Sequence, residues 1–224
     1  MLSRKTLHTL LGGEIQVRSL NPYIEAFTHV SMVTACGYSQ ERLEWLGDSL
    51  WQAALSMLLH KNYEFATEHA LTRVRMKLIS GTRLADIGRK MHLEDFLHLS
   101  DEARDLVLFD KVYEDTFEAL VGAIFVDQGF DGVLIFVRYV VRRFVDGEDL
   151  FVDDDYKKML YGAAKKKNVV FSFETIYKNQ QHHTTMTFGE SVTNAQASQK
   201  RIAESQAAQA LCAELNLDRT IRMW

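Results

Sequence analysis

The sequence contains very little proline and cysteine, and no long apolar run near its start. Pro22 is the single proline among 224 residues, and Cys36 and Cys212 are the two cysteines. Two distant cysteines outside any C-x-x-C pattern exclude a disulfide-rich scaffold and a typical zinc site, so we expect two reduced, partly buried thiols. Because no apolar leader is present, we expect no signal peptide, no transmembrane helix, no membrane partner and a cytoplasmic location.

The charge is small overall but unevenly distributed. The chain has 26 Lys and Arg against 30 Asp and Glu, a formal net charge of −4. Residues 152–224 hold ten of the basic and eight of the acidic side chains, so this part is net +2 and residues 1–151 are net −6. A polyanion would therefore be bound mainly by the C-terminal part, whereas the N-terminal acids are available for a metal.

The stretch from Glu41 to Leu50 opens an apolar segment that is typical of a buried helix. Glu44 and Asp48 are four residues apart, so a helix places them on one face, with Glu41 a turn behind. Like charges at this spacing repel, and burial of unpaired carboxylates is unfavourable. We therefore expect something positive between them.

A second apolar helix is predicted from Lys111 to Asp127, and it carries another pair of acids. Asp115 and Glu118 are three residues apart and share one helix face. If the two helices pack side by side, their carboxylates form a cage of oxygen ligands, which selects hard cations such as Mg²⁺ or Mn²⁺. The alternative is a set of solvated surface acids, against which the apolar surroundings argue.

Both segments resemble the signature motifs of the ribonuclease III family. Glu-Arg-Leu-Glu-Trp-Leu-Gly-Asp-Ser-Leu is similar to the first motif, which usually has Phe in place of Trp45. Lys-Val-Tyr-Glu-Asp-Thr-Phe-Glu-Ala-Leu-Val-Gly-Ala-Ile-Phe-Val-Asp is similar to the second, with Glu114 where a small residue is common. The resemblance implies an endoribonuclease that hydrolyses double-stranded RNA by metal-assisted attack of water. It also implies 5′-phosphate and 3′-hydroxyl ends with short 3′ overhangs.

The predicted metal ligands, for one or two Mg²⁺ ions with Mn²⁺ as a substitute, are Glu44, Asp48, Asp115 and Glu118. Asp48 and Glu118 are predicted to be the catalytic acids on which the rate depends most. Glu41 and Glu68 are candidate accessory acids. Glu68 lies in a segment that resembles the family's Pro-x-x-x-Glu-Gly-x-Leu-Thr region, and a solvated helix acid is an equally good interpretation of it.

The resemblance also implies a homodimer, because one site per subunit must cut each strand. Trp45 lies on the helix face away from the acids, where it either inserts into the partner subunit or packs in the core of its own chain. His29 lies in a stretch similar to the family's Ala-Leu-Thr-His-Arg-Ser. A histidine there could act as a general base, but we expect it to fix local helix packing.

The polar, acidic run that ends at Asp155 predicts a linker between two domains. We assign residues 1–147 to an all-α endonuclease domain, 148–154 to the linker and 155–218 to a small α+β domain. Within the first domain, the apolar spacing of residues 82–97 predicts one further amphipathic helix.

Beyond the linker, periodicity predicts helices at 156–167 and 199–215 and strands at 171–177, 184–188 and 191–195, with a two-residue turn at Gly189-Glu190. The order α-β-β-β-α resembles a double-stranded RNA-binding domain. Tyr161 and Gly162 replace the usual Gln and Glu of its first helix. We therefore expect an altered minor-groove contact with phosphate contact retained.

Four residues of this domain are predicted to bind RNA. Lys200 and Arg201 begin the last helix, where side-chain charge and free backbone N–H groups both favour phosphate. Lys158 lies in the segment that resembles the opening of the first helix. His182, expected in the loop before the second strand, matches a position that in such domains reaches the minor groove.

A different class of function is a duplex-RNA-binding protein that sequesters RNA without cutting it, for example a silencing suppressor. Loss of one of the four acids would favour that class. Because all four acids are present, the sequence predicts the endoribonuclease.

Overall fold

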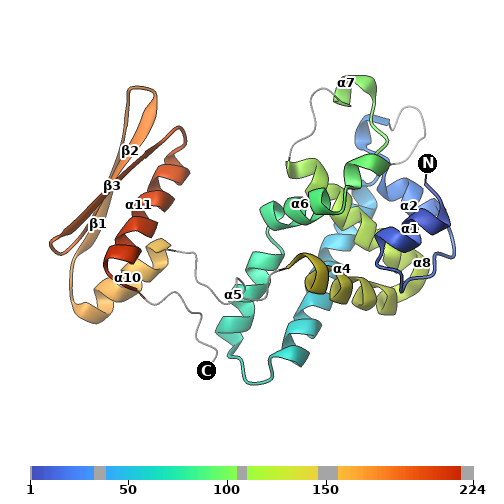
Figure 1. The fold of residues 1–224 in the computed structure, drawn as a ribbon, viewed down its shortest axis with the longest axis horizontal. Coiled ribbons are helices and arrows are strands. Elements are labelled where there is room, and N and C mark those ends of the chain that lie inside the picture. Colours follow the sequence, from blue (N-terminus) through green and yellow to red (C-terminus); the bar gives the residue numbers. More distant parts are fainter. Residues whose placement is uncertain (1, 33–38, 105–109, 146–155, 218–224) are drawn as a thin grey trace. The chain divides into compact units, whose positions relative to one another are not determined.

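The structure is a computed structural model that describes residues 2–32, 39–104, 110–145 and 156–217. The chain divides into two compact units, unit 1 within residues 1–150 and unit 2 within residues 151–221 (Figure 1). The predicted linker at 148–154 lies outside the described residues, as do the domain ends at 147, 155 and 218 and Cys36. The proposed domain boundaries therefore stay predictions.

Unit 1 is helical. Its elements are α1 (Arg4–Leu10), α2 (Asn21–Ala26), the 3-10 turn η1 (Val30–Met32), α4 (Glu41–Asn62), α5 (Glu68–Leu78), α6 (Gly81–Lys90), the 3-10 turn η2 (Leu93–Phe96), α7 (Asp101–Arg104) and α8 (Asp110–Phe144).

Helix α8 forms the centre of unit 1 and packs against α2, α4 and α6. It contains the predicted helix 111–127 and continues beyond it, with a break at Gly129, whose φ of 72° is not helical. Among the described helices, α8 is the one that is long and apolar enough to cross a membrane. Its side chains instead form the core of unit 1, where Phe117 and Phe136 are fully buried beside Trp51 of α4.

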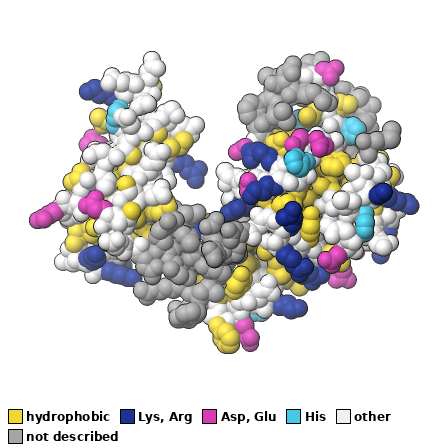
Figure 2. All heavy atoms as spheres, viewed as in Figure 1, with side chains coloured by type: hydrophobic (Ala, Val, Ile, Leu, Met, Phe, Trp, Pro, Cys, Tyr) yellow, Lys and Arg dark blue, Asp and Glu magenta, His cyan; other side chains and the backbone are white. Residues whose placement is uncertain are grey.

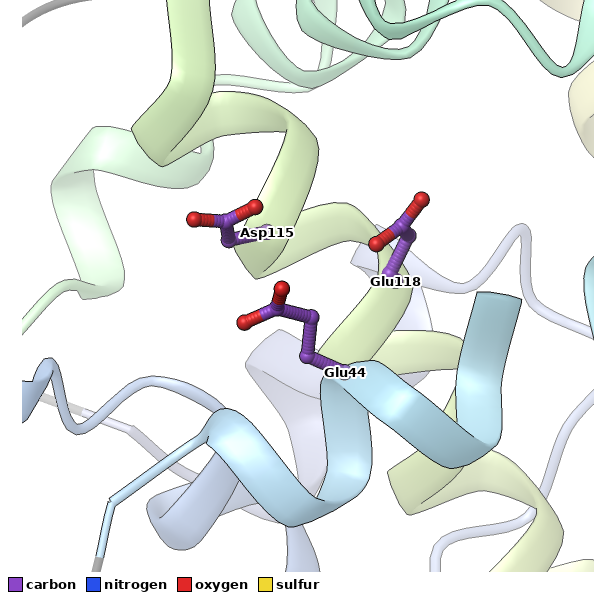
Figure 3. Close-up of side chains that lie close together, drawn as sticks. All are labelled: Glu44, Asp115 and Glu118. Atoms are coloured by element: carbon purple, nitrogen blue, oxygen red, sulfur yellow. The ribbon is translucent and has the colours of Figure 1, made fainter. Parts of the chain in front are cut away.

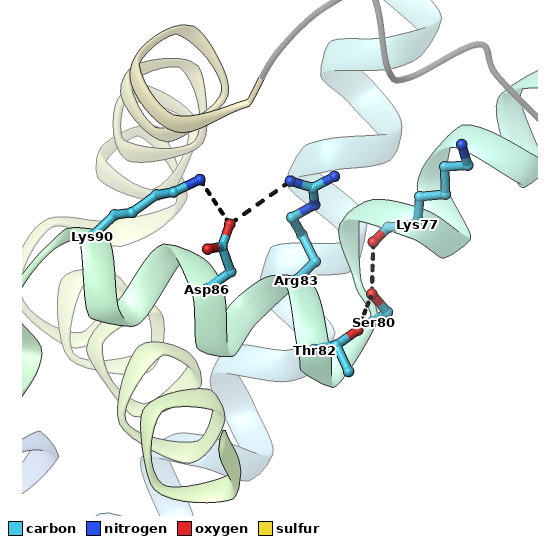
Figure 4. Close-up of polar contacts among 6 residues, drawn as sticks. All are labelled: Lys77, Ser80, Thr82, Arg83, Asp86 and Lys90. Atoms are coloured by element: carbon cyan, nitrogen blue, oxygen red, sulfur yellow. Dashed lines mark hydrogen bonds and ion pairs between the residues drawn. The ribbon is translucent and has the colours of Figure 1, made fainter. Parts of the chain in front are cut away.

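A short turn at Ser80 joins α5 to α6 (Figure 4). The Ser80 hydroxyl donates a hydrogen bond of 2.8 Å to the Lys77 carbonyl. One turn into α6, Asp86 accepts from the Lys90 ammonium at 2.8 Å and lies 3.8 Å from the Arg83 guanidinium. These contacts stabilise the turn and the exposed side of α6, whereas its buried residues, among them Leu84 and Ile87, lie on the side that packs against α8.

The helix predicted over residues 82–97 ends earlier than expected. α6 stops at Lys90, and the chain then forms η2 as a separate turn. The reason is His92, which has a left-handed backbone conformation with φ of 54° that a continuous helix does not allow.

Unit 2 consists of a three-stranded antiparallel sheet in the order β1-β2-β3, with two helices on one side of it (Figure 1). Its elements are α10 (Tyr156–Lys167), β1 (Phe171–Lys178), β2 (Gln181–Phe188), β3 (Ser191–Ala197) and α11 (Lys200–Glu214). Its core contains Leu160, Met186, Leu211 and Cys212, and the Cys212 thiol is buried there. An all-α domain followed by an α-β-β-β-α domain is therefore confirmed.

The second hairpin of the sheet is confirmed, because Phe188 pairs with Ser191 across the turn. The first hairpin is tighter than expected. Asn179 and Gln180 both adopt left-handed conformations, with φ of 52° and 60°, so that strand pairing continues to the residues on either side of the turn. The expected position of His182 in a loop is therefore wrong: it lies inside β2.

Candidate active site

Two glycines set the distance between the helices that carry the acids. Gly47 of α4 faces the Glu118 carbonyl, and a Cβ added there would lie 1.7 Å from its oxygen. Gly122 of α8 faces the Leu43 carbonyl, and a Cβ added there would lie 2.3 Å from its oxygen. The two backbones therefore touch at this crossing, which places the acids of α4 beside those of α8.

Carboxylates from both helices meet next to the crossing (Figure 3). Glu44 of α4 and Asp115 and Glu118 of α8 each offer one oxygen, and these oxygens lie within 4.8 Å of one another. Glu118 is only 7% exposed, whereas Glu44 and Asp115 are half-buried. Carboxylates this close cannot all be ionised unless a cation lies among them.

Lys111 supplies the positive charge that the spacing of the acids predicts. Its Nζ lies 2.5 Å from Asp115 Oδ1, 3.8 Å from Glu114 Oε2 and 4.0 Å from Glu44 Oε1. Burial by itself would lower the pKa of Lys111, but the hydrogen bond and charge of Asp115, together with the two glutamates, raise it. Sequence reasoning missed Lys111, although it precedes Asp115 by four residues, a spacing that pairs opposite charges on a helix.

The crowding of the acids changes their proton affinity. Burial, followed by the charges of Asp48 and Glu114, raises the pKa of Glu118 to about 8 against the opposing charge of Lys111. Burial and the charge of Asp115 also raise the pKa of Glu44. A divalent cation would stabilise the ionised form of each carboxyl, and oxygen ligands alone are the donor set of a hard cation. The residues present therefore fit such a metal.

Asp48 lies beside this group but outside the set of three oxygens. Its charge acts on Glu118, and Gln52 donates a hydrogen bond of 2.7 Å to Asp48 Oδ1. The structure thus brings three of the four predicted ligands together and holds the fourth next to Glu118. Gln52, one turn after Asp48 on α4, is a positioning residue that the acid spacing alone did not reveal.

Comparison with known proteins gives the family of this chain. The ribonuclease III domain model matches residues 41–129, the segment that carries all four acids. Ribonuclease 3 of Leuconostoc citreum is 32% identical over 165 residues, which cover 70% of this chain and 69% of that protein. The chain belongs to the ribonuclease III family. At the family level, this confirms the prediction of an endoribonuclease specific for double-stranded RNA.

Two further relatives extend the comparison. Putative protein A464R of Paramecium bursaria Chlorella virus 1 is 28% identical over 168 residues, which span 74% of this chain but 60% of that protein's length. The nuclease domain of ribonuclease III from Campylobacter jejuni is 27% identical, with a TM-score of 0.56, and the match covers 63% of this chain and 99% of that domain. The structural likeness is therefore to a nuclease domain.

Trp45 of this family member is 77% exposed. The alternative that it packs in the core of its own chain is therefore wrong. The indole at the centre of the core is that of Trp51, which is fully buried and donates a hydrogen bond to the Leu78 carbonyl at 3.3 Å. A large exposed aromatic side chain on the helix of the acids is available to a partner.

The two accessory acids are placed differently relative to the site. Glu41 accepts a hydrogen bond from Ser39 at 3.0 Å, and its charge contributes to the raised pKa of Glu44. Glu68 is exposed in the first turn of α5 and accepts a hydrogen bond of 3.0 Å from Thr72. Glu41 is thus electrostatically linked to the site, whereas Glu68 has the local contacts of a helix acid.

His29 makes contacts that fit the expected packing role. The Nδ1 atom of its ring accepts a hydrogen bond from the Ser31 backbone N–H at 3.2 Å, and the backbone N–H of His29 donates to the His98 carbonyl at 3.1 Å. Burial lowers the pKa of His29, although the charges of Asp115 and Glu41 oppose this shift. The histidine therefore ties η1 to the segment after η2 at one side of the acids.

Glu114 adds a further carboxylate that sequence reasoning assigned no role. A Cβ added at Gly81 would lie 2.6 Å from the Glu114 carboxylate oxygens, so this side chain covers the start of α6. An acid at a helix N-terminus is favourable. Its charge also raises the pKa of Glu118, which couples α6 to the site.

In unit 2, the predicted RNA-binding residues lie on three elements. Lys158 is exposed on α10, and Lys200 and Arg201 are exposed in the first turn of α11. Lys200 Nζ lies 3.9 Å from Glu204 Oε1. His182 is half-buried in β2, with its ring 4.8 Å from that of Tyr177.

Proposed function

We propose that this chain cleaves both strands of double-stranded RNA by hydrolysis, leaving 5′-phosphate and 3′-hydroxyl ends with short 3′ overhangs. The observation that carries the proposal is the group of carboxylates from α4 and α8. Three of its oxygens lie within 4.8 Å of one another at the crossing of two helices. Membership in the ribonuclease III family supports the substrate class.

The acids would hold one or two Mg²⁺ ions, with Mn²⁺ as a substitute. Glu44, Asp115 and Glu118 would be ligands, and Asp48 would complete the set from beside Glu118. A bound metal supplies an activated water and stabilises the charge that develops on the phosphate.

Asp48 and Glu118 are the residues on which we expect the rate to depend most. Glu118 carries a proton at neutral pH in the metal-free protein, because its pKa is about 8, and it must release that proton to become a ligand. Gln52 holds one oxygen of Asp48 by a hydrogen bond, which fixes the orientation of the carboxylate and leaves its other oxygen available as a ligand. Glu44 and Asp115 would be supporting ligands.

We propose that the active protein is a cytoplasmic homodimer, since one site per subunit must cut each strand. Trp45 would insert into the partner subunit, and its 77% exposure supports this role. The related structure from Campylobacter jejuni is described as having a region involved in dimer formation in its nuclease domain.

Unit 2 would hold the duplex. Lys158, Lys200 and Arg201 are exposed cations that would contact phosphates. His182 would contact the minor groove. His182 lies in β2, directly after a two-residue turn rather than in a loop. Its side chain would therefore reach less far into the groove than a histidine on a longer loop.

The test is a gel assay of a long RNA duplex and of a short one of about two helical turns, each with Mg²⁺ and with EDTA. We expect metal-dependent cutting of duplex RNA and no cutting of single-stranded RNA. Asp48→Asn should reduce cleavage on the order of 100-fold or more while duplex binding is retained, since even loss of an outer partner of a metal ligand costs 10–100-fold.

The matched control is Asp131→Asn, which changes an exposed acid of α8 and should cut at the wild-type rate. Undiminished cleavage by Asp48→Asn would remove Asp48 from the site. Binding of duplex RNA without metal-dependent cutting by the wild type would instead establish the sequestering protein.

A further inference from the structure

Figure 2 shows Lys and Arg side chains beside acidic ones on the surface of unit 1. Lys111 makes such contacts within the candidate active site. Its Nζ lies 2.5 Å from Asp115, 3.8 Å from Glu114 and 4.0 Å from Glu44. The Lys111 side chain is 65% exposed, so its ammonium can leave these carboxylates without disturbing the core. Lys111 is therefore a cation that is tethered to the site but not fixed in it.

The ammonium and a divalent cation require the same oxygens. The acid group consists of the three carboxylates whose oxygens lie within 4.8 Å of one another, Glu44, Asp115 and Glu118 (Figure 3). Asp115 Oδ1 is buried and accepts no hydrogen bond of regular geometry, so the ammonium is its counter-charge. Mg²⁺ would approach such an oxygen to about 2.0–2.1 Å. Because two cations on the same oxygens repel each other, binding of the metal requires the ammonium to move.

Glu114 offers the displaced ammonium a second partner. Its carboxylate lies 3.8 Å from Nζ of Lys111, three residues away on the same helix, but it does not belong to the acid group. It also lies against the start of α6, within 2.6 Å of a Cβ added at Gly81, where the helix N-terminus stabilises its negative charge. Glu114 can therefore keep its position and hold the ammonium while a metal binds Asp115 and Glu44.

We propose that Lys111 occupies the acid group of the metal-free protein and moves to Glu114 when a divalent cation binds. The pair of Lys111 and Glu114 then sets how tightly the metal is held, because the ammonium opposes binding and Glu114 reduces that opposition. This role rests on the metal site of the proposed function and adds the residues that regulate its affinity. A chain with a small residue at position 114, which is common in the family, would lack the acceptor.

The test measures binding of Mn²⁺ to the full chain in the absence of RNA, so that cleavage cannot contribute. Protein freed of metal with EDTA and then dialysed is titrated with Mn²⁺, and the electron paramagnetic resonance signal of the free ion reports what remains unbound. Lys111→Met removes the ammonium and keeps a side chain of similar length. It should bind Mn²⁺ on the order of 10-fold more tightly than the wild type, since coupling between two sites is typically about 5- to 150-fold.

Lys61→Met is the matched control, because it removes an exposed lysine from the last turn of α4, the helix that carries Glu44. Lys61 lies roughly 25 Å from Glu44 along the helix, so its loss should leave the Mn²⁺ affinity unchanged. Thermal unfolding shows whether each variant is folded. If Lys111→Met is not, Lys111→Gln replaces it, because the amide also lacks the charge but can donate a hydrogen bond to Asp115. It should likewise bind Mn²⁺ more tightly than the wild type.

Glu114→Gln tests the movement of the ammonium. In the wild type this change removes the acceptor of the ammonium as well as one negative charge, so Mn²⁺ binding should weaken. In a Lys111→Met background only the charge is lost. The effect there should be smaller by about threefold or more, within the range for coupled neighbours. An equal effect in both backgrounds would show that Glu114 acts on the metal without Lys111, and it would overturn the proposal.

The results separate this role of Lys111 from the metal site itself. If the wild type binds Mn²⁺ and a folded Lys111→Met binds it no more tightly, the ammonium does not compete with the metal, and the proposal fails while the proposed function stands. Weaker binding by folded Lys111→Met would likewise refute the proposal and make Lys111 a support that orders the acids. If neither protein binds Mn²⁺, the metal site of the proposed function fails, and the role of Lys111 fails with it.

Discussion

The Glu118 carboxyl favours its protonated form in the metal-free protein, whereas it must be ionised to bind a metal. Without metal its pKa is about 8, against an ordinary value of 4.5. Glu118 of the folded protein therefore keeps a proton that the unfolded chain releases. This difference stabilises the fold, and the contribution is fully present below the ordinary pKa of 4.5. The contribution decreases as the pH rises and is lost above about pH 8.

Glu118→Gln tests this prediction, because glutamine has the same shape and does not ionise. In EDTA, we expect the melting temperature of the wild type to fall more than that of the variant between about pH 5 and about pH 9. Added Mg²⁺ should raise the melting temperature of the wild type at the upper pH and have little effect on the variant. Asp131→Asn serves as the control and should keep the wild-type pH dependence. Parallel pH profiles for wild type and Glu118→Gln would contradict the assignment.

Single residues of the site were predictable where their spacing determined their neighbours. Glu44, Asp115 and Glu118 follow from helical periodicity once two apolar helices are assumed to pack. The spacing of the acids implies a positive charge between them but does not reveal whether a side chain or a metal supplies it, so Lys111 was not predicted. Which carboxylate oxygens come together depends on side-chain rotamers, and residue spacing does not reveal these. For that reason the spacing did not show that Asp48 lies outside the group of three oxygens.

At the scale of elements, the site depends on how closely α4 approaches α8. A Cβ at position 47 would lie 1.7 Å from a backbone oxygen, a contact that only a shift of the helices can relieve. Gly47→Ala should therefore destabilise unit 1 by about 1–3 kcal/mol, the usual cost of overpacking, and it should also reduce cleavage. Denaturant unfolding and the gel assay measure the two effects.

Gly162→Ala is the matched control for that substitution. A Cβ there meets nothing within 4 Å, and the position is helical. The change should leave the protein as stable as the wild type or raise its stability by roughly 0.5–1 kcal/mol, because alanine favours a helix. A Gly47→Ala variant with wild-type stability and activity would show that the helices are free to separate without losing the site.

The ends of the elements divide into those that the sequence predicts and those that depend on backbone conformation. The helix at 156–167 and the turn at Gly189-Glu190 agree with the structure, since both have strong local signals. The predicted start of β2 and the predicted end of α6 do not agree with the structure. Both are set by residues other than glycine in left-handed conformations, Asn179 with Gln180 and His92, and such residues give little signal in a sequence. The close approach of α4 and α8, by contrast, did leave a signal in the sequence, because each acidic motif contains a glycine.

At the scale of the whole molecule, the exposed Trp45 predicts self-association. Trp45→Ala should raise the dimer dissociation constant on the order of 30-fold or more, the effect of losing an aromatic contact worth about 2 kcal/mol. Sedimentation over a range of concentrations measures it. Trp45→Phe, which has the family's usual residue, should remain dimeric, and Phe65→Ala controls for loss of an exposed ring. A wild type that stays monomeric at all concentrations would contradict the prediction.

The division of charge between the two units predicts how the protein responds to salt. Lys200 and Arg201 lie in the first turn of α11, where no acid is present and their charge is unfavourable for the helix dipole. Such an arrangement is suited to an anion, which would contact both the side chains and the free N–H groups. Lys200→Ala with Arg201→Ala should therefore weaken duplex binding in EDTA and reduce the slope of log affinity against log salt by about 2, one for each lost phosphate contact.

Arg142→Ala with Arg143→Ala is the control pair, because it removes two neighbouring exposed cations from a helix end of unit 1. We expect a smaller change in slope for this pair, since residues 1–151 are net −6 and attract RNA less. If both pairs reduced the slope equally, the duplex would be held by the whole surface rather than by unit 2. If only the control pair did so, the phosphate contacts would belong to unit 1.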